Sequence, residues 1–277
     1  RAIGTVRQGI KAVLTEMHAP TQAKAVVRLA LLAAERQAHV ADSDAPRPVR
    51  HVVPYGDGGA APLHYWRFGA ENGQPVLLLH GALFGVMSSP ALITAARLFG
   101  LDVIAPERPG YGMTALPGGA DPVALTVQRA QQTLRAAGVS RALVVAHDVG
   151  TAYAFALARA APDCVSAIIC APATPPMTGW AQTADMPPLH RVSAFVTQKA
   201  PALMEAIVKL GVNRATREGL RALPQMIFAD SAHDRSVLQQ PAAYPVLENL
   251  FLSVTDQQGA GFLQDMFVTN LNWSGWL

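Results

Sequence analysis

Four short, almost wholly apolar runs, each ended by turn residues, constrain the fold of this chain more than any other sequence feature. They are "PVLLLHG" from Pro75, "LDVIAPERPG" from Leu101, "ALVVAHDVG" from Ala142 and "VSAIICAPA" from Val165. Strands that are apolar on both faces are typical of a parallel sheet covered by helices. Helical stretches separate the four runs, so the sequence predicts an α/β domain with a mostly parallel sheet.

The segments around these runs complete the predicted domain. Residues 121–137 predict a crossover helix, with Asp121 as N-cap, Pro122 at the first helical position and Gly138 just past the end. Ahead of the parallel sheet, "RHVVPYG" and "LHYWRFG" are separated by a Gly-rich stretch and predict an antiparallel pair. From about residue 176 the sequence is helical and interrupted by prolines, which predicts a helical cap at about 176–272.

Composition excludes several classes of protein. With 277 residues, 51% of them hydrophobic, the chain can bury the core of one large domain plus a smaller appendage. An uninterrupted apolar run of about 18 residues and a secretory signal are both lacking, so we expect no membrane contact and a cytoplasmic location. Cys164 and Cys170 have no further cysteine or histidine pair at ligand spacing, so neither a metal nor a cofactor is expected.

The amino-terminal segment differs from the rest. The net charge of +3 is mild, yet residues 1–50 hold eight Lys and Arg against four Asp and Glu. Residues 5–17 predict an amphipathic helix with a basic outer face, and a second helix follows from Thr21. The Pro- and Asp-rich stretch after them predicts a linker at about 41–49. We therefore divide the chain into residues 1–40, the linker 41–49 and a large domain 50–277.

The stretch "VVAHDVG", residues 144–150, contains the main candidate site. Asp148 lies between the small residues Ala146 and Gly150, where a buried strand is predicted to turn sharply into a helix. The order of elements from Val49 to Pro175 resembles the α/β-hydrolase fold, whose nucleophile occupies such an elbow. The resemblance implies that Asp148 stands at the nucleophile position and that the backbone N–H groups of Ala82 and Val149 face the developing oxyanion.

The resemblance also assigns roles to two neighbouring segments. In this family the histidine of the "HG" pair shapes the oxyanion loop, which implies a structural role for His80. The segment "ERPGYG", with Arg108, Gly110 and Gly112, is interpreted as a rigid turn.

An aspartate at the elbow rules against ordinary serine-esterase chemistry, because an acyl-enzyme ester needs a hydroxyl there. "HDVG" is similar to the pattern of haloalkane dehalogenases and epoxide hydrolases, whose carboxylate attacks an sp³ carbon. Dehalogenases usually have tryptophan where this chain has Val149, and epoxide hydrolases use cap tyrosines, of which Tyr244 is the only one after residue 175. The fold's acid and histidine are expected beyond residue 277, so we expect the domain to lack its last strands and to be catalytically incomplete. The alternative is a ligand-sensing domain without turnover, in which Asp148 anchors a small molecule.

The first 40 residues suggest a second function. "IGTVRQGIKAVLTEMHAPTQAKAVVRLALL" resembles the second half of a LuxR-type helix-turn-helix. On that resemblance Thr5, Arg7, Gln8 and Lys11 contact DNA, the basic groups mostly at phosphates. Gly9, Glu16 and Gln22 depart from the pattern, and the alternative is a helical hairpin packed on the large domain.

Together the two resemblances imply a transcriptional regulator that joins a LuxR-type DNA-binding domain to an α/β-hydrolase domain. Its expected partners are DNA and a small-molecule ligand or substrate, and a homodimer is compatible with the sequence.

Overall fold

The computed structural model covers most of the large domain. It describes residues 49–55, 60–83, 85–86, 90–179, 181–218, 231–233, 236 and 254–276. The predicted DNA-contacting residues Thr5, Arg7, Gln8 and Lys11 lie outside these ranges, as does Tyr244. All structural statements about this chain therefore refer to its α/β domain.

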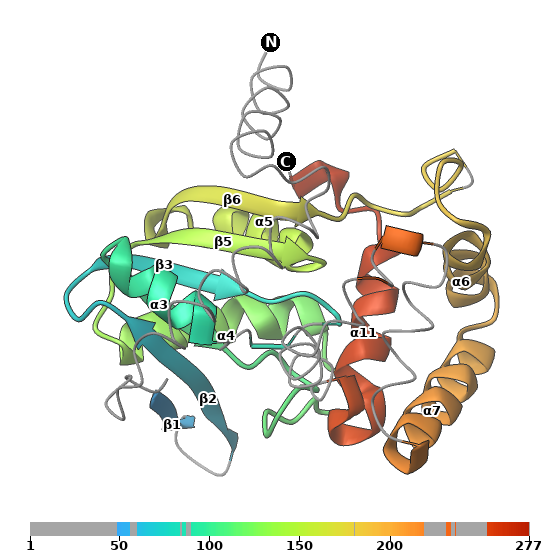
Figure 1. The fold of residues 1–277 in the computed structure, drawn as a ribbon, viewed down its shortest axis with the longest axis horizontal. Coiled ribbons are helices and arrows are strands. Elements are labelled where there is room, and N and C mark those ends of the chain that lie inside the picture. Colours follow the sequence, from blue (N-terminus) through green and yellow to red (C-terminus); the bar gives the residue numbers. More distant parts are fainter. Residues whose placement is uncertain are drawn as a thin grey trace.

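Within the described residues, a six-stranded sheet forms the centre of the domain (Figure 1). Its order is β1-β2-β4-β3-β5-β6. The first two strands pair antiparallel, β2 pairs antiparallel with β4, and the remaining neighbours are parallel. The strand bounds are Val49–Tyr55 for β1, Ala60–Gly69 for β2, Gln74–Leu79 for β3, Leu101–Pro106 for β4, Ala142–Asp148 for β5 and Val165–Ala173 for β6. The predicted α/β class, the four parallel strands and the preceding antiparallel pair are confirmed.

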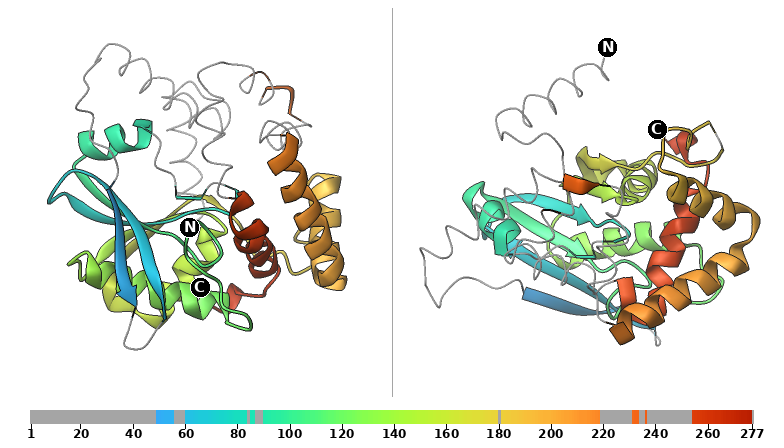
Figure 2. Two further views of the ribbon diagram at one scale, coloured as in Figure 1. Left: turned by 90° about the horizontal axis from the view of Figure 1, so that it is seen from below. Right: turned by 45° about the vertical axis from the view of Figure 1, so that its right-hand side comes forward.

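Helices cover both faces of the sheet because successive residues of its inner strands point to opposite sides. On β3, Val76 and Leu78 pack with α3 (Pro90–Leu98) in one apolar cluster. Leu77 and Leu79 pack on the other face, with α4 (Pro122–Ala136) and α5 (Gly150–Ala160). Figure 2 shows α3 on one side of the sheet and α4 and α5 on the other.

Strand β6 differs from the sequence expectation. Its apolar run predicts a strand buried on both faces, but within the described structure only Val165 is buried and Ile169 is 49% exposed. The reason is its place in the sheet, since β5 is the one strand paired with it in the described structure. An apolar run therefore predicts a strand here without predicting its position in the sheet.

The carboxyl-terminal part is helical, as predicted. It contains α6 (Pro188–Lys199), α7 (Pro201–Glu218) and α11 (Ala260–Thr269), and the short 3₁₀ turns of the domain are η1 (Pro162–Cys164), η2 (Asp256–Gly259) and η3 (Ser274–Trp276). The arrowheads of β3, β5 and β6 point toward α11, and α6 and α7 lie beyond it (Figure 1). Within the described ranges no helix combines the length and the apolarity needed to cross a bilayer.

Helix α11 connects the outer helices to the core. Val268 on α11 is fully buried in the cluster beneath the sheet, together with Trp273. On another side of α11, Phe262 and Met266 pack against the cluster of α7 that contains Val208. The part of the chain predicted as a cap thus includes a helix that belongs to the core.

The predicted N-cap of α4 is present, and it generates a stability prediction. The Asp121 side chain accepts hydrogen bonds from the backbone N–H groups of Val123 at 2.9 Å and Ala124 at 3.3 Å. Asp121→Ala should lower the free energy of unfolding by about 1 kcal/mol, because two amide donors lose their acceptor. Urea denaturation measures the change. Asp121→Asn keeps an acceptor and should lose less, whereas an alanine variant as stable as the wild type would contradict the cap.

Candidate active site

Asp148 lies at a sharp turn between β5 and α5. It ends the strand with φ at +54°, a left-handed conformation that is uncommon for a residue with a side chain. Val149 then acts as the N-cap of α5, and Gly150 begins the helix. The half-buried Asp148 side chain is thereby presented at the carboxyl ends of the parallel strands, where open α/β sheets place their ligands.

Two glycines allow the backbones around this turn to approach each other. A Cβ atom on Gly150 would lie 2.3 Å from the carbonyl oxygen of Leu79 on β3. One on Gly81 would lie 2.5 Å from Nδ1 of His147 and 2.9 Å from Cβ of Asp148. All three distances are shorter than real Cβ contacts, so a side chain at either position would force the turn or the loop to move.

Both carboxylate oxygens of Asp148 accept hydrogen bonds. The backbone N–H of Ala82 donates to Oδ2 at 3.1 Å, and the hydroxyl of Thr174, which follows β6, donates to Oδ1. The structure thus brings the predicted residues Ala82 and Asp148 together. Val149 is adjacent in the chain, with its side chain buried in the core. Sequence reasoning missed Thr174, because nothing in "APATPP" distinguishes its hydroxyl from that of a loop residue.

His80 is buried directly behind the loop and shapes it. The backbone N–H of Arg108 donates to Nε2 of His80 at 3.4 Å, so Nε2 carries no proton and Nδ1–H donates to the Gly81 carbonyl at 2.9 Å. Burial lowers the pKa of His80 well below its ordinary value, and the guanidinium of Arg108 lowers it further. The ring is therefore neutral, which agrees with the structural role that the resemblance implies.

A buried ion pair joins Arg108 to Asp265 of α11. Arg108 Nη1 and Nη2 reach the two carboxylate oxygens at 2.5 and 2.7 Å, and the side chains are only 2% and 1% exposed. The hydroxyl of Tyr111 contacts Asp265 Oδ2 at 2.5 Å, and that of Tyr153 donates to Oδ1 at 2.7 Å. The guanidinium also lies over both phenol rings, 4.9 and 4.6 Å from their centres.

Burial and the Asp265 carboxylate together shift the pKa values of the other residues in this cluster. Desolvation lowers the pKa of Arg108, but the Asp265 carboxylate, together with Tyr153 and Tyr111, raises that pKa above its ordinary value overall. Desolvation raises the pKa of Tyr111 and Tyr153 well above the ordinary value, and Asp265 raises it further. Arg108 therefore remains charged, and both phenols keep the protons that they donate.

The turn after β4 is present as the sequence predicts. Gly110 and Gly112 have φ of +85° and +54°, as a tight turn requires. The sequence interpretation of this segment does not identify the partner of Arg108, which contacts a residue 157 positions away. Asp265 itself lies in "GFLQDMFVTN", where an acidic residue on a helix usually faces solvent.

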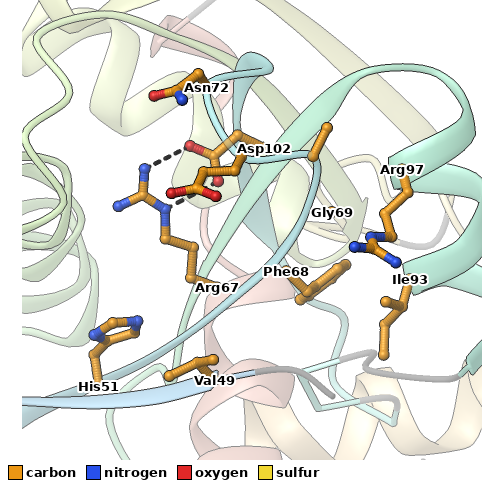
Figure 3. A pocket seen from close by; sticks show the side chains of 11 residues that line it. Val49, His51, Arg67, Phe68, Gly69, Asn72, Ile93, Arg97 and Asp102 are labelled. Carbon is orange, nitrogen blue, oxygen red and sulfur yellow. Dashed lines mark hydrogen bonds and ion pairs between the residues drawn. The ribbon is translucent and has the colours of Figure 1, made fainter. Parts of the chain in front are cut away.

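A separate cavity of about 570 Å³ lies at the other edge of the sheet (Figure 3). Asp102 lies near the amino end of β4, while Asp148 ends the parallel strand β5, so the cavity is remote from the elbow. Arg67 pairs with both oxygens of Asp102 at 3.0 and 2.7 Å within it. The lining residues are Val49, His51, Arg67, Phe68, Gly69, Ala70, Glu71, Asn72, Ile93, Arg97 and Asp102.

The described residues also bear on metal binding. Among them, no three His, Cys, Asp or Glu side chains are placed to hold a metal ion. Cys164 and Cys170 are free thiols that are half-buried rather than fully buried. Burial raises the pKa of both thiols.

The elbow generates a prediction about Gly150. Gly150→Ala should lower the free energy of unfolding by about 1–3 kcal/mol, because the added methyl group collides with the β3 backbone. Gly211 is the matched control: it also lies in a helix, and a Cβ added there meets nothing within 4 Å. Gly211→Ala should be neutral or stabilising by up to about 1 kcal/mol. Thermal and urea denaturation compare the two variants, and equal effects would contradict the close approach at Gly150.

Solved structures support the fold. The epoxide hydrolase CorEH is 18% identical, with 81% of this chain and 74% of that chain covered and a TM-score of 0.57. An epoxide hydrolase mutant from Vigna radiata is 20% identical, with 82% and 74% covered and a TM-score of 0.56. At these identities the likeness concerns the fold alone. A comparison with curated proteins finds no match.

The match to a family model covers most of the chain. The model described as the alpha/beta hydrolase family matches residues 76–270, which include β3 to β6, the Asp148 elbow and α11. This chain belongs to the α/β-hydrolase family.

Proposed function

We propose that the domain is a hydrolase of a small organic electrophile, with Asp148 as the nucleophile. The observation that carries the proposal is a carboxylate, rather than a hydroxyl, at the strained elbow residue. Its Oδ2 is bonded by the Ala82 N–H, the arrangement that would stabilise an oxyanion in a later step. The names of CorEH and the Vigna radiata protein favour an epoxide as the substrate class.

The first chemical step follows from the carboxylate. An oxygen of Asp148 attacks an sp³ carbon of the epoxide, a new C–O bond forms, and the ring C–O bond breaks. The electron pair of the broken bond stays on the ring oxygen, which takes a proton, and the product is a hydroxyalkyl ester of Asp148. With an alkyl halide the same attack expels halide.

The second step is hydrolysis of that ester. Water adds to the Asp148 carbonyl carbon, and the resulting oxyanion is stabilised by the N–H groups of Ala82 and, by the family resemblance, Val149. When this intermediate collapses, the bond between the carbonyl carbon and the alkoxy oxygen breaks. The alkoxy oxygen takes a proton and leaves as part of the diol, and the Asp148 carboxylate is regenerated. This step needs a base to take the proton of the water. The alkylation step needs no base, so formation of the ester tests the proposal more directly than its hydrolysis does.

Covalent trapping tests the nucleophile. The full chain incubated with styrene oxide should gain the mass of one epoxide, and peptide mapping should place the adduct on Asp148. Asp148→Asn is the matched control, because it keeps the shape of the side chain and removes its charge. It should form no adduct at this position.

Two outcomes would contradict the proposal. One is a wild-type chain that forms neither a covalent adduct nor a diol with styrene oxide and forms no adduct with bromobutane. The other is an adduct that forms equally in Asp148→Asn. Reversible binding of an electrophile without a covalent adduct would instead favour the ligand-sensing alternative.

A DNA-binding role is a separate proposal, which rests on the sequence of residues 1–40 alone. The family match begins at residue 76 and lends it no support. If Arg7 and Lys11 contact phosphates, replacing both by alanine should reduce the slope of log affinity against log salt by about 2. Binding of the full chain to a random DNA duplex at several salt concentrations measures the slope. Lys199→Ala is a control on α6, and a chain that binds no DNA at low salt would contradict the proposal.

A further inference from the structure

The peptide unit between Gly81 and Ala82 links the Asp148 site to the buried cluster behind it. A trans peptide is planar, so its C=O and N–H groups point in opposite directions. On one side the Gly81 oxygen accepts from His80 Nδ1 at 2.9 Å and from Arg108 Nη2 at 3.3 Å. On the other side the Ala82 N–H lies 3.1 Å from Oδ2 of Asp148. Whatever fixes this carbonyl therefore also aims the N–H.

The next peptide unit is held from the same side. The single phenolic proton of Tyr111 is shared between Asp265 Oδ2 at 2.5 Å and the carbonyl oxygen of Ala82 at 3.0 Å. Arg108 and Tyr111, which hold the two successive loop carbonyls, are thus both bound by one carboxylate. Tyr153 also binds that carboxylate, at Oδ1, and within the described structure its hydroxyl donates no hydrogen bond to the loop.

The position of Asp265 is itself fixed by its helix. The N–H of Gly261, in the first turn of α11, donates to the Gly110 carbonyl at 3.1 Å, and a Cβ on Gly110 would lie 2.5 Å from Gly261 N. Next to α11, Asp256 accepts from the N–H of Gly112 at 2.9 Å. The turn after β4 and the start of α11 are therefore in direct backbone contact.

We propose that Asp265 is a positioning residue of the Asp148 site, acting through Arg108 and Tyr111 to fix the loop carbonyls and so to aim the Ala82 N–H at Asp148. The catalytic consequence of this role rests on the proposed function, whereas its structural consequence, an ordered loop, does not. Helix α11, which also packs on α7, thereby controls the geometry of the nucleophile from 117 residues further along the chain.

Two tyrosine variants test the proposal with the same chemical change. Tyr111→Phe and Tyr153→Phe each remove one fully buried hydroxyl that binds Asp265, but Tyr111 alone of the two also contacts the loop. Asp265→Asn is the direct variant, and because it breaks a buried ion pair it is informative only if circular dichroism and thermal melting show a folded chain. The tyrosine pair keeps the test decisive if it does not fold.

The measurements separate positioning from stability. Hydrogen–deuterium exchange of the full chain reports the order of residues 80–83. The rate of Asp148 alkylation is measured at several styrene oxide concentrations, which separates the maximal rate from the affinity for styrene oxide. Tyr111→Phe should speed hydrogen exchange in the loop by about tenfold and lower the maximal alkylation rate by about tenfold, while its binding of styrene oxide stays within about twofold of wild type. Asp265→Asn, if it folds, should show the same changes. Tyr153→Phe should melt at a lowered temperature yet keep both loop exchange and alkylation rate within about twofold.

Opposite results would overturn the proposal. If the two tyrosine variants change loop exchange and alkylation equally, or if neither changes them, Asp265 acts only in stability. If wild type forms no adduct, the proposed function fails, but loop exchange still decides the positioning role. If wild type forms the adduct and Tyr111→Phe alters neither exchange nor rate, the positioning role alone is rejected.

Discussion

The buried carboxylate of Asp265 is the interaction on which the geometry of this domain depends. Taking a carboxylate and a guanidinium out of water costs several kcal/mol per ion, so such a pair is tolerated only when nearly every lone pair and proton has a partner. Here Arg108 supplies two donors to the carboxylate and the two phenols supply two more, while Nε of Arg108 is buried without a hydrogen-bond partner in the described structure. These donors come from the turn after β4 and from α5, and the carboxylate comes from α11. Satisfying one charge therefore fixes three segments that are far apart in the chain.

The elbow needs that fixed environment because its own conformation is unfavourable. A residue other than glycine in a left-handed conformation costs about 1–3 kcal/mol, and it persists only where surrounding contacts hold it. At Asp148 these contacts are the Ala82 N–H on one oxygen and the Thr174 hydroxyl on the other. The absence of a Cβ at Gly150 then lets the helix start against β3. Strain at Asp148 is thus maintained by hydrogen bonds on its side chain and by close packing beneath its backbone.

Whether a feature could be predicted from sequence depends on how far apart in the chain the interacting residues lie. The strands, the Asp121 cap and the elbow are encoded within about ten residues each, by apolar runs, a capping residue and small residues around Asp148, and the structure has them as predicted. Pairing between distant residues leaves no such local signal. Asp265 lies in the largely apolar stretch "GFLQDMFVTN", and nothing in that stretch identifies Arg108 as its partner, so only the fold reveals the pair. The exposure of β6 was missed for the same reason, since it depends on strand order.

Two Arg–Asp pairs in the described part of this domain are both bidentate but have different consequences. Arg67 and Asp102 meet at the cavity edge, where the arginine side chain is 36% exposed, so water screens the pair and its net contribution to stability is small. The side chains of Arg108 and Asp265 are only 2% and 1% exposed, so solvent does not reach the place of a lost partner. Removing one member would leave a buried charge, and the surrounding loops would have to rearrange to solvate it. Geometry alone therefore does not assign a role to an ion pair. The exposed pair joins β2 to β4 at Arg67, whereas the buried pair at Arg108 also holds the Gly81 carbonyl in the loop beside Asp148.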